Sequence, residues 1–189
     1  MNTPAPALAP ADPAPPPGAV VPTLHTERLV LRPFAESDLD AYAAMSADAE
    51  VMRHIGAGGP VARDIAWRQM ALFAGHWALR GYGMWAVQEK SSGARVGRAG
   101  FLNPEGWPAN ELGWLLGRAH WGRGYAFEAA AAARRHGREV MGLAGRLISL
   151  IRAENARSIA LAQRLGARHE ETIEFLGATA QVWRHPDAG

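Results

Sequence analysis

The feature that most constrains the fold of this sequence is an abrupt change from strand to helix near residue 120. The stretch ELGWLLG at 111–117 has the apolar character of a buried strand, and AFEAAAAARRHGREVM at 126–141 is an alanine-rich helical segment. HWGRGY lies between them, with Gly122 and Gly124 on either side of Arg123. Glycine brings no side chain to packing and loses much conformational entropy on folding. Two glycines at the start of a helix therefore need an explanation.

One explanation is an anion-binding site. The first turn of a helix has N–H groups without partners, and the helix dipole adds partial positive charge there. Without Cβ atoms a phosphate can approach the backbone closely, and Arg123 would add a formal charge. The motif is neither a Walker loop, since no Gly-Lys-Ser/Thr follows, nor a dinucleotide fingerprint, since Phe127 occupies the third glycine position. The alternative is that the two glycines only form a tight turn.

Periodicity and turn residues predict the other elements. Strands are expected over 24–34, 82–90, 94–103, 111–117, 146–151, 168–176 and 179–185, and helices over 36–47, 62–80, from the glycine motif to about 141, and 155–166. Ser37 and Asn155 are the predicted N-caps, and Gly81 and Gly166 the predicted helix ends. The order β-α-α-β-β-β-α-β-α-β-β predicts an α/β fold, a single layer of mixed sheet covered by helices.

Composition sets the domain organisation and excludes several kinds of site. Proline and alanine dominate residues 1–22, which predicts a disordered tail, and residues 23–187 are expected to form one domain. The chain has no cysteine, so disulfides, cysteine nucleophiles and thiolate metal sites are excluded. Its seven histidines show no His-x-x-x-His or His-x-His spacing, and we expect no metal site.

Charge and hydropathy indicate the expected partners and location. Of the 20 basic residues, 19 are arginine; they alternate with 18 acidic residues along the chain, and the net charge is only +2. This pattern favours a solvated surface over a nucleic-acid interface. The sequence has no apolar run long enough to span a bilayer and no secretory signal pattern. We expect a cytoplasmic protein, monomeric or homodimeric, that binds neither nucleic acid nor membrane.

The stretch ELGWLLGRAHWGRGYAFEAA resembles the acetyl-CoA signature of the GNAT superfamily of N-acetyltransferases. The superfamily pattern Gln/Arg-x-x-Gly-x-Gly/Ala aligns with 121–126 and departs at its first position, which is Trp121. That departure, with TERLVLRPFAESDLDAY and NARSIALAQRLGA, resembles the branch containing the ribosomal-protein N-terminal acetyltransferases. The resemblance spans 23–186. It implies a mixed, mostly antiparallel sheet flanked by helices, with splayed central strands that bind acyl-CoA.

The resemblance also implies roles for individual residues. The strand edge at Leu115 and Leu116 would pair with the pantetheine arm of CoA. Asn155 would hydrogen-bond pantetheine, although it could equally be only a helix cap. Ser158 would protonate the leaving thiolate, although a serine in a first helical turn is commonplace. The pyrophosphate would be held by the main chain of the motif, which consists of Trp121, Gly122, Arg123, Gly124, Tyr125 and Ala126.

Acetyl transfer to an amine needs a neutral amine, a hydrogen-bond donor for the thioester oxygen and a proton for the thiolate. We expect Glu111 to take the amine proton, directly or through water. The alternative is a glutamate at the sheet end that faces solvent or pairs with an arginine. An N–H at Leu115 or Leu116 would polarise the acetyl carbonyl. Trp107, fixed beside a proline, is a candidate wall of the acceptor site or simply a packed loop anchor.

The expected function is therefore an acetyl-CoA-dependent N-acetyltransferase. Acetyl-CoA would be a co-substrate, and the acetyl group would pass directly to a primary amine on a protein N-terminus or a small molecule, with no covalent enzyme intermediate and no metal. One alternative is a non-catalytic acyl-CoA-binding module that keeps the fold. A second is a nucleic-acid-binding domain that uses its arginines, for which a steep salt dependence of binding would be diagnostic.

Overall fold

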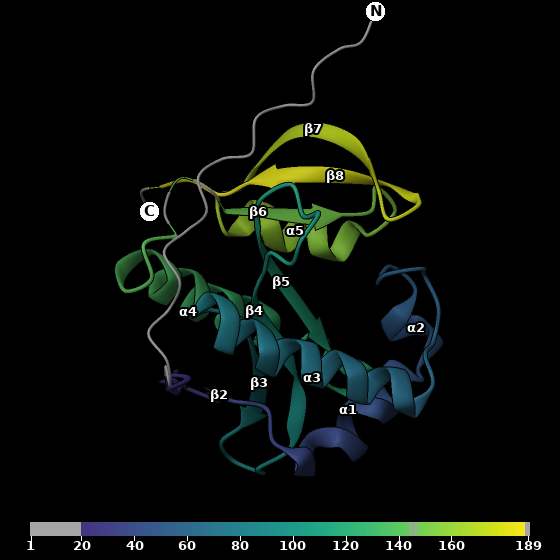
Figure 1. Cartoon of the computed structure of the whole chain (residues 1–189), viewed down its shortest axis with the longest axis vertical. Helices are drawn as coiled ribbons and strands as arrows, with labels where there is room; N and C mark the ends of the chain where they lie inside the picture. The colour runs from purple at the N-terminus through teal and green to yellow at the C-terminus, as the bar shows by residue number, and fades with distance from the viewer. Residues whose placement is uncertain (1–19, 144, 146, 188–189) are drawn as a thin grey trace, which may run out of the picture.

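The computed structural model in Figure 1 describes residues 20–143, 145 and 147–187. One eight-stranded sheet has the order β1-β2-β3-β4-β5-β6-β8-β7. The only parallel neighbours in it are β5 and β6, which confirms the mixed, mostly antiparallel sheet. The strands are β1 (Leu24–His25), β2 (Leu29–Arg32), β3 (Met84–Glu89), β4 (Arg95–Leu102), β5 (Asn110–Leu116), β6 (Leu147–Ile151), β7 (Arg168–Phe175) and β8 (Ala178–Arg184).

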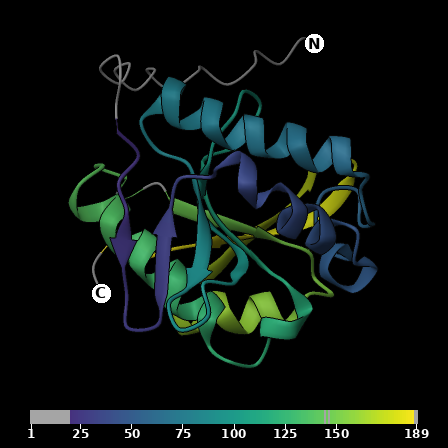
Figure 2. The ribbon, with the colours of Figure 1, turned by 90° about the horizontal axis from the view of Figure 1, so that it is seen from below.

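The helices cover both faces of the sheet (Figure 2). They are α1 (Leu39–Ser46), α2 (Ala49–Met52), α3 (Arg63–Arg80), α4 (Tyr125–Glu139) and α5 (Ala156–Arg164), with 3₁₀ turns η1 (Glu36–Asp38) and η2 (Arg118–His120). In Figure 2, α1 and α3 lie above the sheet, and α4 and α5 lie below it. None of the helices in the described part of the chain has the length and apolar character needed to cross a bilayer.

The N-terminal part differs from the sequence prediction. The strand predicted over 24–34 is two strands, β1 and β2, because the chain turns back on itself after His25. Thr26 closes this turn, since its Oγ1 accepts from the N–H of Leu29 at 2.9 Å. The tail predicted over 1–22 lies mostly outside the described residues, but Pro22 accepts a hydrogen bond from Trp85 Nε1 at 2.7 Å. Contacts with the domain therefore begin before residue 23.

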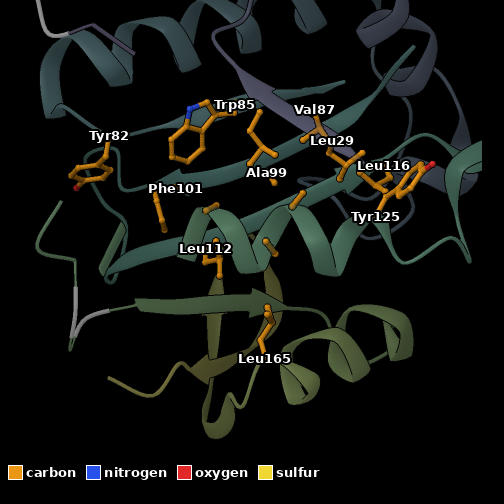
Figure 3. Packing of buried hydrophobic residues seen from close by; sticks show 14 of the residues in the cluster. Leu29, Tyr82, Trp85, Val87, Ala99, Phe101, Leu112, Leu116, Tyr125 and Leu165 are labelled. Carbon is orange, nitrogen blue, oxygen red and sulfur yellow. The ribbon is translucent and has the colours of Figure 1, made fainter. Parts of the chain in front are cut away.

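The main hydrophobic core lies between the sheet and α4 (Figure 3). Ala129, Ala130 and Ala133 of α4 are fully buried there, and their small side chains let the helix lie close to the strands. Gly137 continues this face: a Cβ at Gly137 would lie 2.4 Å from the ring of Phe101. The alanine-rich composition of the segment thus reflects close helix-to-sheet packing.

A buried carboxylate ties η1 to the sheet. Asp38 accepts two hydrogen bonds from Arg32, both at 2.7 Å, one from Arg95 at 3.0 Å and one from the N–H of Ala35 at 2.8 Å. Burial alone would raise the pKa of Asp38, but these donors lower it to about 2. The prediction of Ser37 as N-cap was wrong, because Ser37 lies inside η1 and the Asp38 carboxylate bonds back to Ala35.

We predict that Asp38→Asn destabilises the fold in a pH-dependent way. A carboxyl whose pKa falls from about 4 in the unfolded chain to about 2 in the folded protein contributes roughly 2 kcal/mol. This contribution is complete above about pH 5 and is lost as the pH falls from about 4 to about 2. Urea unfolding at pH 7 should therefore show the full deficit, and unfolding near pH 2.5 a much smaller one.

The control for this experiment is Asp64→Asn, which breaks an exposed ion pair with Arg68. Exposed pairs contribute little, so its effect should stay within about 0.5 kcal/mol at both pH values. A deficit for Asp38→Asn that did not change with pH would contradict the electrostatic explanation and would indicate lost packing instead.

Candidate active site

The central feature of the site is the separation of β5 from β6. The two strands pair only where Asn110 and Glu111 lie beside Leu147 and Ile148. Beyond Glu111, β5 stays paired with β4, while β6 pairs with β8 on its other side. Figure 1 shows β5 running away from β6. One edge of β5 therefore lacks a neighbouring strand, as the splay expected from the sequence requires.

A side chain completes the hydrogen bonding where the strands part. The hydroxyl of Ser149 on β6 donates to the carbonyl oxygen of Leu112 at 2.6 Å, and the Nε2 of His185 lies 2.9 Å from the same hydroxyl. Because the hydroxyl hydrogen is directed to Leu112, Nε2 must carry the hydrogen in the second bond. Burial lowers the pKa of His185 to about 4, so the ring is neutral at pH 7. Ser149 and His185 hold the strands at their point of separation.

Strand alternation fixes which main-chain groups of β5 face the gap. The carbonyl oxygens of Leu112 and Leu116 are on that side, since they accept from Ser149 and from Trp121 Nε1 (2.8 Å). Successive residues of a strand direct their N–H and C=O groups to opposite sides. The N–H groups of Trp114 and Leu116 therefore face the gap, and the peptide of Leu115 belongs to the ladder with β4. The groups that could pair with a ligand at this edge therefore belong to Trp114 and Leu116, and not to the adjacent residues Leu115 and Leu116 predicted from the sequence.

A cleft of about 940 Å³ occupies this gap. Its walls come from the open edge of β5, the start of α4, the start of α5 and the segment that follows α2. It brings together nine of the residues that the sequence predicted for cofactor binding or catalysis: Leu115, Leu116, Trp121, Gly122, Gly124, Tyr125, Ala126, Asn155 and Ser158. Arg123 is not among the lining residues.

The glycine motif forms one end of this cleft. Gly122 and Gly124 have φ angles of +74° and +78°, in the left-handed region that favours glycine. Gly124 is the N-cap of α4 and, having no side chain, leaves the first N–H groups of the helix without a side-chain cap. A Cβ on Gly122 would meet no protein atom within 4 Å. The turn alone therefore requires glycine, and it also leaves N–H donors and open space beside the cleft.

The side chain of Arg123 points away from the cleft. Its Nη2 forms an ion pair with Glu89 at 2.8 Å, and its guanidinium lies over the ring of Tyr125 at 4.6 Å. The hydroxyl of Tyr125 also bonds to Glu89, and Arg28 donates to the carbonyl oxygen of Arg123 at 2.9 Å. The expectation of a free positive charge at the motif was therefore wrong. Through these contacts Arg123 stabilises the loop on the side that faces away from the cleft.

Positive charge at the rim of the cleft comes from α5. Arg157 lies over the ring of Trp121 at 4.4 Å, and Arg164 lies over the ring of Phe127 at 3.9 Å. All four residues line the cleft. Cation–π contacts fix the two guanidinium groups on aromatic surfaces without neutralising them. Arg53, which follows α2, also lines the cleft. The cleft therefore combines helix N–H donors with three arginines, which together suit a ligand carrying several phosphates.

The start of α5 adjoins both this cleft and a second pocket. Asn155 caps the helix, since its Oδ1 accepts from the N–H of Ser158 at 3.2 Å. The hydroxyl of Ser158 accepts from Trp114 Nε1 at 3.3 Å, which leaves its own hydrogen available to another group. Trp114, Asn155 and Ser158 line both cavities. The cap predicted at Asn155 is confirmed, and its side chain still borders the site.

The second pocket, of about 220 Å³, contains Glu111 and Trp107. Trp107 Nε1 donates to Glu111 Oε2 at 2.7 Å, and the main chain of Leu150 on β6 also hydrogen-bonds the carboxylate. Burial raises the pKa of Glu111, against the lowering effects of these bonds and of the nearby charge of Arg98. Trp107 also packs edge-to-face on Phe175, with ring centroids 4.9 Å apart. Trp107 thus positions the carboxylate and forms part of the wall of the pocket.

Three residues of this region were not identified from the sequence. Trp114 separates the two cavities, Ser149 completes the splay, and Arg98 lies buried beside the second pocket. A polar or charged residue within an apolar strand was the available signal for two of them, in VGRAGFL and LISLI. Trp114 gave no such signal, because a tryptophan in a strand is ordinary core.

The sequence matches the family model described as "Acetyltransferase (GNAT) domain" over residues 28–168. An uncharacterized N-acetyltransferase of Bacillus licheniformis, p20, is 30% identical over 151 residues, which are 78% of this chain and 83% of that protein. The uncharacterized protein YkkB of Bacillus subtilis is 34% identical over 98 residues, which cover only 50% of this chain and 56% of YkkB.

Solved structures show the same fold. An acetyltransferase from Agrobacterium tumefaciens superposes with a TM-score of 0.77 and 33% identity, over 86% of this chain and 93% of that one. RimL, a ribosomal L7/L12 alpha-N-protein acetyltransferase solved in complex with coenzyme A, has a TM-score of 0.71 at 19% identity, over 87% of this chain and 97% of its own. The match to the family model, the p20 relative and the splayed sheet agree, and this chain belongs to the GNAT family of acetyltransferases.

Proposed function

We propose that the protein transfers an acetyl group from acetyl-CoA directly to a primary amine, with no covalent enzyme intermediate. The observation that carries this proposal is the meeting of the two cavities at Trp114, Asn155 and Ser158. The larger one has the size and donors for a CoA-like ligand, and the smaller one holds a carboxylate of raised pKa. A thioester in the first cavity and an amine in the second would meet at β5.

The residues around the larger cleft suit acetyl-CoA. The uncapped N–H groups of α4 would hold the pyrophosphate, and Arg157 and Arg164 are charged groups available to further phosphate oxygens. The gap-facing N–H groups of Trp114 and Leu116 would donate hydrogen bonds to the amide carbonyls of the pantetheine arm, which would pair with β5 as an added strand does. One of these N–H groups would also stabilise the developing charge on the acetyl oxygen.

Glu111 is the proposed base. An amine acceptor with a pKa near 10 arrives mostly protonated and must lose a proton before it can attack. A carboxylate of raised pKa at the edge of the acceptor pocket is better matched to this task than an ordinary surface glutamate. The amine nitrogen then bonds to the acetyl carbon as the C–S bond breaks. The amine proton passes to Glu111, directly or through one water.

Ser158 is the proposed donor to the leaving sulfur. Its hydroxyl accepts from Trp114, so its own hydrogen is free to be donated into the cleft. A thiolate that receives this hydrogen bond or proton leaves more readily. Asn155 orients Ser158 through the cap of α5 and is a second polar group near the same point.

The test of the proposed function is a screen of primary amines with acetyl-CoA, reading released thiol and identifying the acetylated product by mass. An active enzyme produces both in equal amounts. Acetyl-CoA that binds and raises the melting temperature without transfer to any amine would instead support a non-catalytic acyl-CoA-binding module.

We predict that Glu111→Gln keeps acetyl-CoA affinity and lowers kcat by about 10²- to 10⁴-fold, the usual range for loss of a general base. The deficit should narrow as the pH rises, because more of the acceptor is then already neutral. Pre-steady-state acetylation rates between pH 6.5 and 10 measure this. A deficit that stayed constant with pH would assign Glu111 to positioning, and an unchanged rate would remove it from the mechanism.

We predict that Trp107→Phe raises the pKa of Glu111 further, because it removes the hydrogen bond that favours the ionised carboxylate. The acidic limb of the pH–rate profile should move to higher pH, and carboxyl NMR of the unliganded protein should show the same shift. Trp67→Phe is a matched control, since its indole bonds only the distant carboxylate of Glu36. An unmoved acidic limb would contradict the assignment of that limb to Glu111.

We predict that Gly122→Ala weakens acetyl-CoA binding at least about tenfold, because its Cβ enters the space beside the uncapped helix N–H groups. The matched control is Gly142→Ala, whose φ of +65° and open surroundings are similar but which lines neither cavity. Both variants should lose about 1 kcal/mol of stability from the positive φ. Equal acetyl-CoA affinity in the two variants would show that the glycine serves only the turn.

A further inference from the structure

Arg98 is a buried cation that forms no ion pair among the described residues, although its charge acts on the nearby carboxylate of Glu111. It lies in the middle of β4, is 8% exposed and has buried residues on both sides in the strand. Its guanidinium contacts the sulfur of Met84 at 3.6 Å and lies over the ring of Phe73 at 5.2 Å. Nε has no hydrogen-bond partner, and none of the ion pairs in the described part of the chain involves Arg98.

Burying a charged guanidinium destabilises the folded protein unless an anion pairs with it. A guanidinium stays protonated when buried, so Arg98 cannot relieve its burial by losing its charge. Charged groups in protein interiors are normally paired and fully hydrogen-bonded. The thioether and the phenyl ring that contact Arg98 supply only weak compensation. The guanidinium of Arg98 is therefore suited to pair with an anion that enters the pocket it lines.

Arg98 lines the smaller pocket together with Glu111, which has the opposite charge when it is ionised. Glu111 already accepts hydrogen bonds from Trp107 and Leu150 and is not ion-paired with Arg98. It is also the only acidic residue among the described residues that line this pocket, whereas Arg152 is a second arginine there. With Glu111 engaged on the amine, the described lining of the pocket offers no other carboxylate to Arg98, and the acceptor itself is a source of one.

We infer that the acceptor is a small amine that also carries an anionic group, a carboxylate or a phosphate, which pairs with Arg98 while the amine faces Glu111. This inference rests on the proposed function. The pocket volume of about 220 Å³ suits a molecule of amino-acid size, and the aromatic pair Trp107 and Phe175 offers an apolar wall to its remaining atoms. A neutral peptide N-terminus lacks the required charge beside its amine.

The experiment compares matched acceptors that differ only in the anionic group. Amino acids are compared with their amides and with the corresponding decarboxylated amines. Aminoalkyl phosphates are compared with the corresponding amino alcohols. A neutral tripeptide is also included. Values of kcat/KM are corrected for the neutral fraction of each amine. We expect anionic members to exceed their matched neutral partners on the order of 10- to 100-fold, the range for a charge-assisted hydrogen-bonded pair. The carboxylate and phosphate series show which anion the site prefers.

Arg98→Met tests whether this residue provides the preference. Methionine keeps an apolar stem against Phe73 and Met84 but removes the charge. KM for anionic acceptors should rise about 10- to 100-fold more than KM for neutral amines at the same pH. Any effect of the lost charge on the pKa of Glu111 should be common to both sets of acceptors, and acetyl-CoA affinity should stay the same. Arg98→Lys should recover part of the preference. Arg68→Met, on the exposed face of α3, is the matched control and should change none of these values. If Arg98→Met does not fold, Arg98→Lys and the wild-type panel decide the outcome.

Equal use of anionic and neutral acceptors by the wild type would overturn the inference and leave the proposed function intact. A preference that persists in Arg98→Met would overturn the role of Arg98. If no amine is acetylated, the proposed function fails, and calorimetric binding of the same matched acceptors to the CoA-loaded protein then decides the inference alone. Binding of the anionic members that disappears in Arg98→Met supports it, and equal binding of matched partners refutes it.

Discussion

The site depends on the hydrogen bond between the Ser149 hydroxyl and the Leu112 carbonyl, at the point where β5 and β6 separate. Opening a sheet in its middle exposes two edges of polar main-chain groups, and a buried group without a partner destabilises the fold. Ser149 satisfies the carbonyl of Leu112, and the indole of Trp121 satisfies that of Leu116. The protein thus supplies partners for two gap-facing carbonyls. The N–H groups of Trp114 and Leu116 and the carbonyl of Trp114 face the same gap, so the open edge of β5 offers a ligand two donors and one acceptor.

The arginines of this chain differ in function according to their partners. Arg32 and Arg95 share the single carboxylate of Asp38, and Arg123 pairs with Glu89, so these side chains tie loops and strands together. Arg157 and Arg164 rest on aromatic rings and keep their charge at the rim of the larger cleft. Arg98 is buried beside the smaller cavity and forms no ion pair among the described residues. The net charge of +2 therefore hides a strong local separation of charge along the two cavities.

The sequence predicted those parts of the fold that local chemistry determines. The strand-to-helix motif, the cap at Asn155 and the two terminal strands β7 and β8 were predicted from local sequence, and the structure has them within a residue or two. Long-range contacts do not follow from local sequence. The partner of Arg123 is Glu89, on β3, and the groups that fix Glu111 include Leu150, on β6. The pairing of Leu115 with β4 also required the register of the sheet, which the sequence does not contain.

Glu111 and Arg98 are two consequences of one desolvated pocket. Burial raises the pKa of Glu111, which makes the carboxylate a stronger base but also favours its protonation. The charge of Arg98, together with the hydrogen bonds from Trp107 and Leu150, acts in the opposite direction and keeps the ionised form accessible. An arginine that was fully paired with Glu111 would cancel this balance by lowering the pKa of the carboxylate too far for proton abstraction. Keeping the two groups apart in the same pocket leaves Glu111 basic and leaves Arg98 free for a second anion.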